Sequence, residues 1–261
     1  KTKAAQLLGI SRSGLYYQSK QFIKDWQLKI RMEEALRQFP SYGHKRLALF
    51  LKVGKNRARR VMKKFGLKPY RRRGRKFKKR KDNGRAYPNL LMTPIPSGPQ
   101  HVWVSDFTHL VYSKTILYLA TVMDIWTREI VGFSLSTSHG VWLVIEAFLS
   151  ALNFRGPPDM IHSDQGSEYR SATYAGLVEE VGVKISMSHK ASPWENGYQE
   201  SFYNQFKVDL GDPNRFEEMG ELVAEIYRTI YSYNHQRIHT ALKMPPRDYA
   251  ILKTLVPNHR Y

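Results

Sequence analysis

The sequence predicts an α/β fold, in which a core built on a mixed sheet follows an all-α region. Three observations support this prediction. Helical periodicity and a strong positive charge occupy the first hundred residues, three consecutive strand-forming runs begin near residue 101, and short helices and strands then alternate. With 261 residues, the chain is long enough for one large domain with small additions or for two medium domains.

The positive charge lies in the first part of the chain. Residues 1–100 hold 28 Lys and Arg against 4 Asp and Glu, whereas residues 101–261 hold 14 against 18. A polyanion, DNA or RNA, is therefore the expected partner of the front, and a solvated basic tail or a ribosomal-type RNA binder is the alternative. The chain contains no cysteine, which excludes disulfides and thiolate metal sites.

No targeting or membrane segment is expected. No apolar run approaches the ~20 residues that a membrane span needs, and no long apolar stretch follows the first charges as in a signal peptide. The chain begins with Lys1 rather than Met, which leaves open whether a segment ahead of it is missing.

The first hundred residues contain the signals of several short helices. Residues 1–22 predict a helix-turn-helix that ends an N-terminal region, because Gly9 interrupts an apolar stripe and Ser11 can cap a second helix. A plain helical hairpin fits these residues nearly as well. Residues 23–67 predict a helical DNA-binding domain, with helices around 27–38, 42–52 and 56–66.

The last of these helices has two different faces. Its apolar side chains, Val61, Met62 and Phe65, are expected to pack inward, and a glycine suited to a C-cap follows them. Its basic side chains lie at three- and four-residue steps on another face, as in a helix that enters a DNA groove. They are Arg57, Arg60 and Lys64. An ordinary solvated face is the alternative.

Residues 68–100 predict a linker. Residues 68–85 have almost no apolar content and should not fold alone. We expect the basic side chains of this run to lie along DNA phosphates: Arg71, Arg72, Arg73, Arg75, Lys76, Lys78, Lys79 and Arg80. Residues 86–100 contain four prolines and predict an extended connector.

The rest of the chain predicts a core over 101–250 and a tail over 251–261. Its expected elements are an antiparallel meander of strands at 102–112, 116–126 and 129–137, a helix at 141–153, a strand within 159–166, a helix at 171–181, a strand at 183–189 and helices at 197–210 and 216–234. The order β-β-β-α-β-α-β-α is that of a ribonuclease-H-like fold. Such a mixed sheet places the first and fourth strands side by side.

Three carboxylates occupy positions that their local structure does not require. Asp106 interrupts a strand, where a buried carboxylate is costly unless it is paired or binds a metal. Asp164 follows the fourth strand, and Glu200 lies on a helix that can cross the same edge. Three converging carboxylates would repel each other without divalent cations. Hard oxygen ligands favour Mg²⁺ or Mn²⁺.

The segments around these carboxylates resemble a known family. Thirty-five residues separate Asp164 from Glu200, as in the D-35-E pattern of retroviral integrases and related bacterial transposases. The matching segments are VWVSDFTHL, IHSDQGSEY, SPWENGYQESFYNQFK and YNHQRIHTALKMPPRDY. The chain is most similar to the insertion-sequence transposases of the IS three family. The resemblance covers roughly 98–250 and, more loosely, 27–67. Glu195 and Gly197 stand where that family usually has Asp and often has Ala.

The resemblance implies a DDE-type polynucleotidyl transferase that cleaves DNA at transposon ends and transfers strands. Two Mg²⁺ or Mn²⁺ ions per active site, about 3.5–4 Å apart, would be held by Asp106, Asp164 and Glu200. Asp106 would bridge both ions, and each of the other two would bind one. A non-catalytic DNA-binding regulator and a simple RNase-H-like nuclease are the alternatives.

The resemblance also implies the partners. They are double-stranded DNA, both terminal inverted repeats and target, and further copies of the chain in a homodimer or higher oligomer on DNA. The location would be the bacterial cytoplasm, with nucleoid association on DNA and no membrane contact. Lys207 matches a basic residue that follows the family's Glu, and Trp194 either packs in the core or stacks on a base at the cleavage point. The expected DNA contacts near the site are Lys190, Trp194, Asn196 and Lys207.

Overall fold

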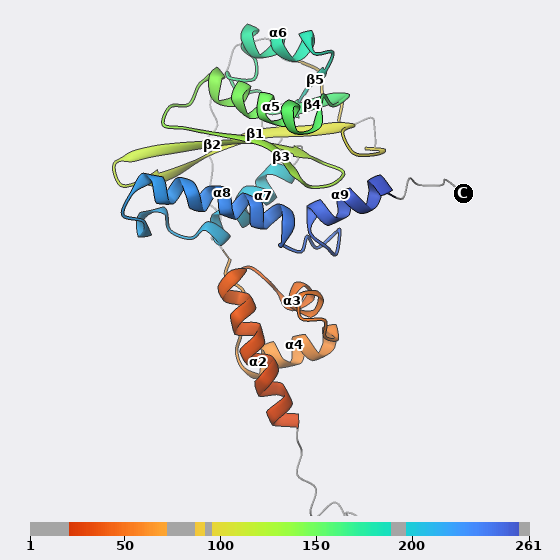
Figure 1. Ribbon diagram of the computed structural model, residues 1–261, viewed down its shortest axis with the longest axis vertical. Coiled ribbons are helices and arrows are strands. Elements are labelled where there is room, and N and C mark those ends of the chain that lie inside the picture. Colours follow the sequence, from red (N-terminus) through yellow and green to blue (C-terminus); the bar gives the residue numbers. More distant parts are fainter. Residues whose placement is uncertain (1–20, 72–86, 92–95, 189–196, 256–261) are drawn as a thin grey trace, which may run out of the picture. The chain divides into compact units, whose positions relative to one another are not determined.

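The computed structural model describes residues 21–71, 87–91, 96–188 and 197–255. The chain divides into two compact units, Lys1–Pro69 and Tyr70–Tyr261 (Figure 1). Residues 1–20, which hold most of the predicted helix-turn-helix, and nearly all of the basic run lie outside the described residues. Within the described ranges, no helix combines the length and apolar character that a membrane crossing needs.

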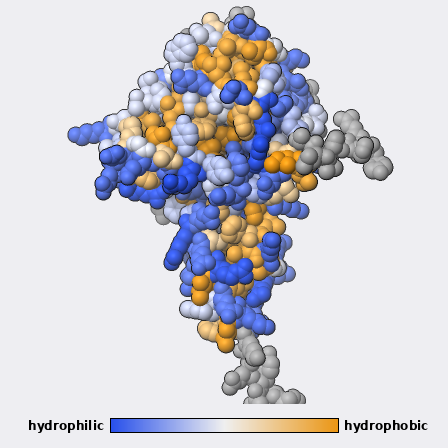
Figure 2. Space-filling model, viewed as in Figure 1, coloured by the Kyte–Doolittle hydropathy of each residue, from blue (hydrophilic) through white to orange (hydrophobic). Residues whose placement is uncertain are grey.

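The first unit contains the three helices predicted for it, α2 (Gln21–Gln38), α3 (His44–Phe50) and α4 (Lys55–Lys64). α2 begins six residues before the predicted start. Leu28 and Met32 of α2 share a buried interior with Leu47 of α3 and Val61 of α4. α4 ends at Lys64, and Gly66, two residues further on, has a φ of +66°, which suits glycine. On the face drawn in Figure 2, apolar residues also reach the surface of this unit.

A buried ion cluster joins α2 to α4. Asp25 of α2 is fully buried, and Arg60 donates to both of its carboxylate oxygens, at 2.7 and 2.8 Å. Lys64 donates to the same carboxylate at 3.0 Å, and Arg57 donates to the Lys24 carbonyl at 3.4 Å. The basic face predicted to enter a DNA groove therefore contacts α2 through all three of its side chains. DNA contact by these three residues stays a prediction.

We expect Asp25→Asn to destabilise the first unit by about 1–3 kcal/mol at neutral pH, because it removes a charged hydrogen-bond acceptor from a buried position. The hydrogen bonds from Arg60, opposed by burial and reinforced by Lys64, hold the pKa of Asp25 well below its usual range. The stability that this carboxylate contributes is therefore present above about pH 4 and is lost as the pH falls.

Amide hydrogen exchange in α2 and α4 of the whole chain measures the effect. Glu33→Gln is the matched control, since the Lys29–Glu33 pair is more exposed and should contribute less than about 0.5 kcal/mol. Equal exchange rates in the two variants would contradict a stabilising role for Asp25.

The second unit is built on a five-stranded sheet in the order β3-β2-β1-β4-β5. β1 pairs antiparallel with β2, and β2 with β3, whereas β4 runs parallel to both β1 and β5. The predicted meander and the predicted contact of the first and fourth strands are both confirmed. The strands are β1 (Val102–Tyr112), β2 (Thr115–Asp124), β3 (Ile130–Ser136), β4 (Met160–Ser163) and β5 (Lys184–Met187).

Helices cover both faces of this sheet (Figure 1). They are α5 (Val141–Arg155), α6 (Ala172–Glu180), α7 (Gly197–Leu210), the short 3₁₀ turn η3 (Pro213–Arg215), α8 (Met219–His235) and α9 (Pro246–Leu255). α5 and α6 bury one apolar cluster around Trp103 and Phe148. α7 and α8 bury the other around Val104 and Phe206. α5 lies so close to β3 that a Cβ at Gly132 would stand 2.4 Å from the Ala151 nitrogen.

Two segments differ from the sequence-based expectation. Pro88 to Leu91, placed in the predicted linker, lie on β5: the Met187 N–H donates to the Pro88 carbonyl at 3.2 Å, and the Leu90 N–H to Ser186 Oγ at 2.8 Å. The prolines of this region carried no sign of that pairing. α9 runs across residue 250, where the tail was expected to begin.

Candidate active site

The β1–β4 ladder places Asp106 and Asp164 at the same level of the sheet. The last pair of the parallel ladder is Val104 with His162, and each aspartate lies two residues further along its strand direction. Asp106 is half-buried and accepts a hydrogen bond from the Phe107 N–H at 2.8 Å. Asp164 is exposed in the turn after β4 and accepts from the Gly166 N–H at 2.9 Å.

Position 166 leaves little room for a side chain in this turn. A Cβ there would lie 3.0 Å from Asp164 Oδ1 and 3.1 Å from Glu168 Oε2. The backbone can approach both carboxylates closely only without a side chain.

Two buried polar side chains fix α7 against the sheet on either side of Glu200. Gln199 donates to the Val104 carbonyl at 2.7 Å and accepts from Thr121 Oγ1 at 3.0 Å. The Tyr203 hydroxyl donates to the Asp106 carbonyl at 2.5 Å. Glu200 lies between them in the first turn of α7, with its side chain exposed. The helix that carries Glu200 is therefore bonded directly to the strand that carries Asp106.

The charges of Asp164, Glu200 and Lys207 all reach Asp106. Burial of its carboxyl group and the charges of Asp164 and Glu200 together raise the pKa of Asp106 to about 8, against the hydrogen bond from the Phe107 N–H and the charge of Lys207. Burial also raises the pKa of Asp164, together with the charge of Glu168 and against the Gly166 hydrogen bond. In this setting the ionised carboxylates are unfavourable, so a bound cation would stabilise them.

The donor set fits a hard divalent cation, since it consists of carboxylate oxygens. In the described ranges, no three His, Asp or Glu side chains are gathered tightly enough to enclose an ion as they stand. Asp164 and Glu200 are exposed, so their side chains are free to turn toward an ion. Metal binding by Asp106, Asp164 and Glu200 therefore requires side-chain movement.

Sequence reasoning missed three polar residues near the site. Glu168 is buried, and His139 Nδ1 lies 3.1 Å from its Oε1. Gln199 and Tyr203 were not singled out because neither is charged nor part of a metal-ligand pattern. Their spacing of four residues around Glu200, which places both on one helix face, is the signal that could have found them.

The closing segment of the family motif supports the fold rather than the site. Asn234 exchanges two hydrogen bonds of 2.9 Å with the backbone of Ile130 at the start of β3. Arg237 is buried and donates to Asp209 of α7 at 2.6 Å. These contacts fasten α8 and the end of α7 to the rest of the unit.

Several predicted DNA contacts are not described. Arg71 is described and exposed. The predicted contacts outside the described residues are Arg72, Arg73, Arg75, Lys76, Lys78, Lys79, Arg80, Lys190, Trp194 and Asn196. All of these DNA contacts stay predictions.

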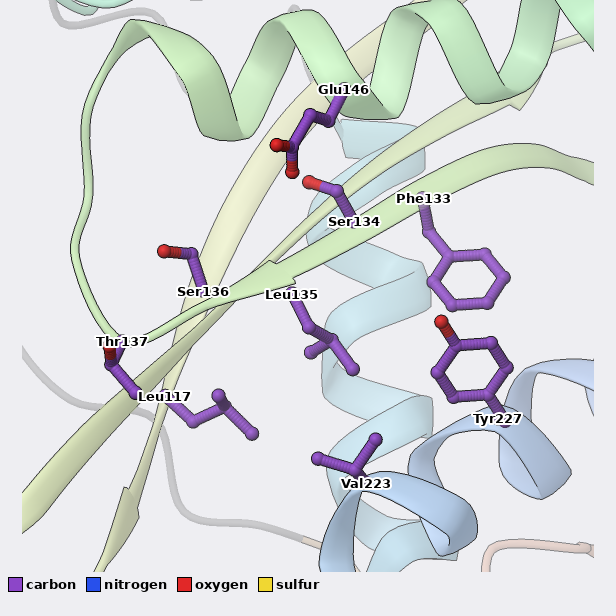
Figure 3. A pocket seen from close by; sticks show the side chains of 9 residues that line it. All are labelled: Leu117, Phe133, Ser134, Leu135, Ser136, Thr137, Glu146, Val223 and Tyr227. Carbon is purple, nitrogen blue, oxygen red and sulfur yellow. The ribbon is translucent and has the colours of Figure 1, made fainter. Parts of the chain in front are cut away.

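A cavity of about 540 Å³ lies on β3, the edge strand two positions from β1 (Figure 3). Phe133 and Tyr227 face each other on one side of the strand, and Ser134 and Glu146 lie on the other. Asp106, Asp164 and Glu200 do not line it, so this cavity is separate from the carboxylates.

We expect the metal-free protein to lose stability as the pH rises from about 4 to about 8. The folded Asp106 carboxyl has a pKa of about 8, whereas the unfolded carboxyl has one of about 3.9. The folded state thus keeps a proton that the unfolded state loses, and the associated stability is complete below about pH 4 and lost by about pH 8. Asp106→Asn should show a flatter profile and exceed the wild type at about pH 9 by about 2–4 kcal/mol.

Calorimetric unfolding across this range, with EDTA or with Mg²⁺, measures the effect. Mg²⁺ should narrow the difference between the two proteins, because a cation stabilises the ionised carboxylate. Asp159→Asn, at an exposed position, is the control and should follow the wild type. Parallel profiles for Asp106→Asn and the wild type would contradict the raised pKa.

Comparisons with known proteins agree with this geometry. Residues 96–193 and 181–246 match two family models, each described as an integrase core domain. The chain is 35% identical over 175 residues to the transposase for insertion sequence element IS904 of Lactococcus lactis subsp. lactis (strain IL1403), covering 65% of this chain and 69% of that protein. It is 34% identical over 254 residues to the insertion element IS600 uncharacterized 31 kDa protein of Shigella sonnei, covering 91% and 93%.

A third relative is the transposase InsF for insertion sequence IS3A of Escherichia coli (strain K12), 33% identical over 147 residues, or 55% of this chain and 51% of that protein. Among solved structures, a chain of the simian T-cell lymphotropic virus intasome in complex with PP2A regulatory subunit B56 gamma matches with a TM-score of 0.54. The match is 17% identical and covers 87% of this chain and 77% of that chain. This likeness and the sheet order confirm the predicted fold.

Proposed function

The chain belongs to the insertion-sequence transposases of the IS three family, and we propose that it cuts DNA strands at the ends of its element and joins them to target DNA in a reaction that depends on divalent metal. The observation that carries this proposal is the convergence of Asp106, Asp164 and Glu200, whose mutual repulsion helps to raise the pKa of Asp106 to about 8. A non-catalytic DNA-binding protein would not need carboxylates in an arrangement that makes their ionisation this unfavourable.

Asp106, Asp164 and Glu200 would hold two Mg²⁺ or Mn²⁺ ions. When bound, such ions supply a lowered pKa for the attacking hydroxyl group and charge stabilisation for the leaving oxygen. Asp106, at the centre of the set, is the carboxylate placed to be shared. Gln199 and Tyr203 orient Glu200 by bonding α7 to β1 and β2. The Lys207 ammonium group, whose charge reaches Asp106, is placed to bind a DNA phosphate.

Two buried phenols close to Asp106, those of Tyr169 and Tyr203, are unsuited to attack a phosphodiester. Burial raises the pKa of Tyr169 and of Tyr203 well above the usual range, and the charge of Asp106 adds to the effect. Both phenols therefore stay protonated. This supports direct transfer between DNA strands without a covalent protein–DNA intermediate.

The proposed partners are the element's double-stranded ends and target DNA. We propose that residues 23–67 and the basic run that follows bind the ends and that the core beginning near residue 101 performs the chemistry. Two ends must meet for strand transfer, so a homodimer or higher oligomer on DNA is proposed. We propose a location in the bacterial cytoplasm, on the nucleoid when the protein is bound to DNA.

The test of the function is nicking of a duplex that carries the element's terminal inverted repeat. Nicking at the repeat boundary is expected with Mg²⁺ and not with EDTA. A protein that binds the repeat but never cuts it with Mg²⁺ or Mn²⁺ would be the DNA-binding regulator instead. Cutting of RNA–DNA hybrids without preference for the repeat would indicate a simple nuclease.

We expect Trp194→Ala and Lys207→Ala both to lower strand transfer on fully paired ends, each by about tenfold. If Trp194 wedges beside a base where the duplex opens, ends that are already unpaired at the cleavage point should rescue Trp194→Ala. They should not rescue Lys207→Ala, because a phosphate contact is lost whatever the pairing. Strand transfer by each variant on paired and unpaired ends measures the difference.

Glu180→Ala, at an exposed position on α6, is the control for non-specific effects. Failure of unpaired ends to rescue Trp194→Ala, or unfolding of that variant, would favour a core position for Trp194.

A further inference from the structure

Arg128 occupies a strained position in the turn between β2 and β3. Its φ is +63°, in the left-handed region that favours glycine. Its backbone N–H donates to the Asp124 carbonyl at 2.8 Å, which closes the turn. Glycine would adopt this conformation with less strain, so the Arg128 side chain offers something that glycine cannot. Strained non-glycine residues of this kind cluster at binding and catalytic sites.

Arg128 is half-buried, and two of its three guanidinium nitrogens are buried without an acceptor in the part of the chain that the structure describes. Its Nε and Nη1 atoms are inaccessible to solvent and make no hydrogen bond. The two carboxylates of this turn, Asp124 and Glu129, already have hydrogen-bond or ion-pair partners. Asp124 accepts the N–H groups of Gln100, Trp126 and Thr127, and Glu129 is paired with Arg155 and Arg247.

A buried guanidinium without an anion is costly, and such an unsatisfied group points to a ligand that is not present. The planar fork of arginine fits the oxygen atoms of phosphate, to which it donates two parallel hydrogen bonds. Arg128 therefore has the character of a phosphate receptor rather than of a structural ion pair.

Tyr198 connects this receptor to the active site. The Arg128 Cζ atom lies 4.0 Å from the centre of the Tyr198 ring, an arrangement that holds the guanidinium plane. Tyr198 is in the first turn of α7, two residues before Glu200, and it is 39% exposed. The amino-terminal end of α7 adds partial positive charge at the same place. An anion bound by Arg128 would thus lie beside the helix that carries Glu200.

We propose that Arg128, braced by Tyr198, binds a backbone phosphate of the DNA strand being cut, next to the phosphate at the carboxylates. This inference rests on the proposed function. The charge of Lys207 reaches Asp106, so we assign Lys207 to the phosphate at the carboxylates. Arg128 is then assigned to a neighbouring phosphate. The contact fixes the register of the strand without reading its sequence.

Single neutral phosphates in the DNA test this assignment. The probe is a duplex of the element's end in which one phosphate at a time, on either side of the cleaved bond, is a methylphosphonate. Binding to the whole chain is measured by fluorescence anisotropy in EDTA, so that no cutting occurs. For the wild type, one flanking position should weaken binding by about tenfold.

Arg128→Gln should bind the unmodified end about tenfold more weakly and should no longer respond to the methylphosphonate at that position. Its log–log salt slope should be less negative by about 0.9, the contribution of one phosphate. Arg128→Lys should keep part of the response, because it keeps the charge but loses the fork. Arg228→Gln, on an exposed position of α8, makes the same charge change and should keep the full response.

Thermal unfolding separates this role from a structural one. Removal of an unpaired buried charge should leave the melting temperature of Arg128→Gln unchanged or higher. If Arg128→Gln melts lower and Arg128→Lys responds to every methylphosphonate like the wild type, the side chain only holds α7 and the inference is wrong. An undiminished response in a folded Arg128→Gln also overturns it. Absence of nicking by the wild type with Mg²⁺ would instead refute the proposed function, which this binding assay does not require.

Discussion

Asp106→Asn, Asp164→Asn and Glu200→Gln are each expected to lower DNA nicking and strand transfer by at least about a thousandfold, while binding to the element's ends changes by less than about threefold. An amide keeps the shape of the carboxyl group but loses the charge that attracts a divalent cation. Because the charges of Asp164 and Glu200 both raise the pKa of Asp106, we treat the three carboxylates as one unit. The three variants should therefore lose activity to a similar extent. A double variant should be no worse than a single one.

Two further variants make this test sharper. Asp159→Asn, at an exposed position, should keep full activity. Glu168→Gln changes a buried carboxylate that raises the pKa of Asp164 but is not assigned to a metal ion, so it should keep part of the activity. Single-turnover nicking and anisotropy with the same labelled duplex measure both properties. If any of the three assigned variants retains substantial nicking, that residue does not hold the metal.

Removal of residues 1–85 is expected to weaken duplex binding by about a hundredfold to a thousandfold near physiological salt. This segment carries all 28 Lys and Arg of the first hundred residues. Each phosphate contact that is lost should make the log–log salt slope less negative by about 0.9. The remaining chain should therefore bind DNA weakly and with little dependence on salt.

The fragment for this experiment begins at residue 86. A fragment that begins at residue 98 would lose Pro88 and Leu90, which are bonded to β5, and so would confuse loss of binding with loss of folding. A full-length chain in which the basic residues of 71–80 are replaced by Gln is the companion variant, and it should show an intermediate slope. Equal affinity of the fragment and the whole chain would refute the assignment of DNA binding to the front.

Much of the core could be predicted because its signals are local. The β-rich runs, the helix of residues 141–153 and the position of Asp164 after a short buried strand are all visible as periodicity and turn chemistry. Asp106 and Glu200 stood out because a carboxylate in a strand and one at a family spacing need a reason. A charged residue within a run of strand-forming residues is easy to recognise in a sequence.

The features that could not be predicted depend on contacts between distant residues. Asp25 is one acid in a basic region, and nothing near it shows that Arg60 and Lys64 will surround it. Gln199 and Tyr203 are neutral, so their bonds to β1 and β2 leave no mark in the charge pattern. The sequence does not distinguish Arg128 from other basic residues. Its positive φ and its guanidinium nitrogens without an acceptor are visible only in the structure.

The ladder between β1 and β4 contains only three residue pairs, from Val102 with Met160 to Val104 with His162. The two aspartates that follow it are 58 positions apart in the chain, and Glu200 lies further on still. Contacts across such long loops form late, because the entropy of closing them is lost before the contacts stabilise the chain. The helices of the first unit meet over much shorter loops. We therefore expect that, during synthesis, the unit proposed to bind DNA completes its fold before α7 reaches the proposed active site, so that a ribosome-bound or truncated chain would bind DNA before it could cut it.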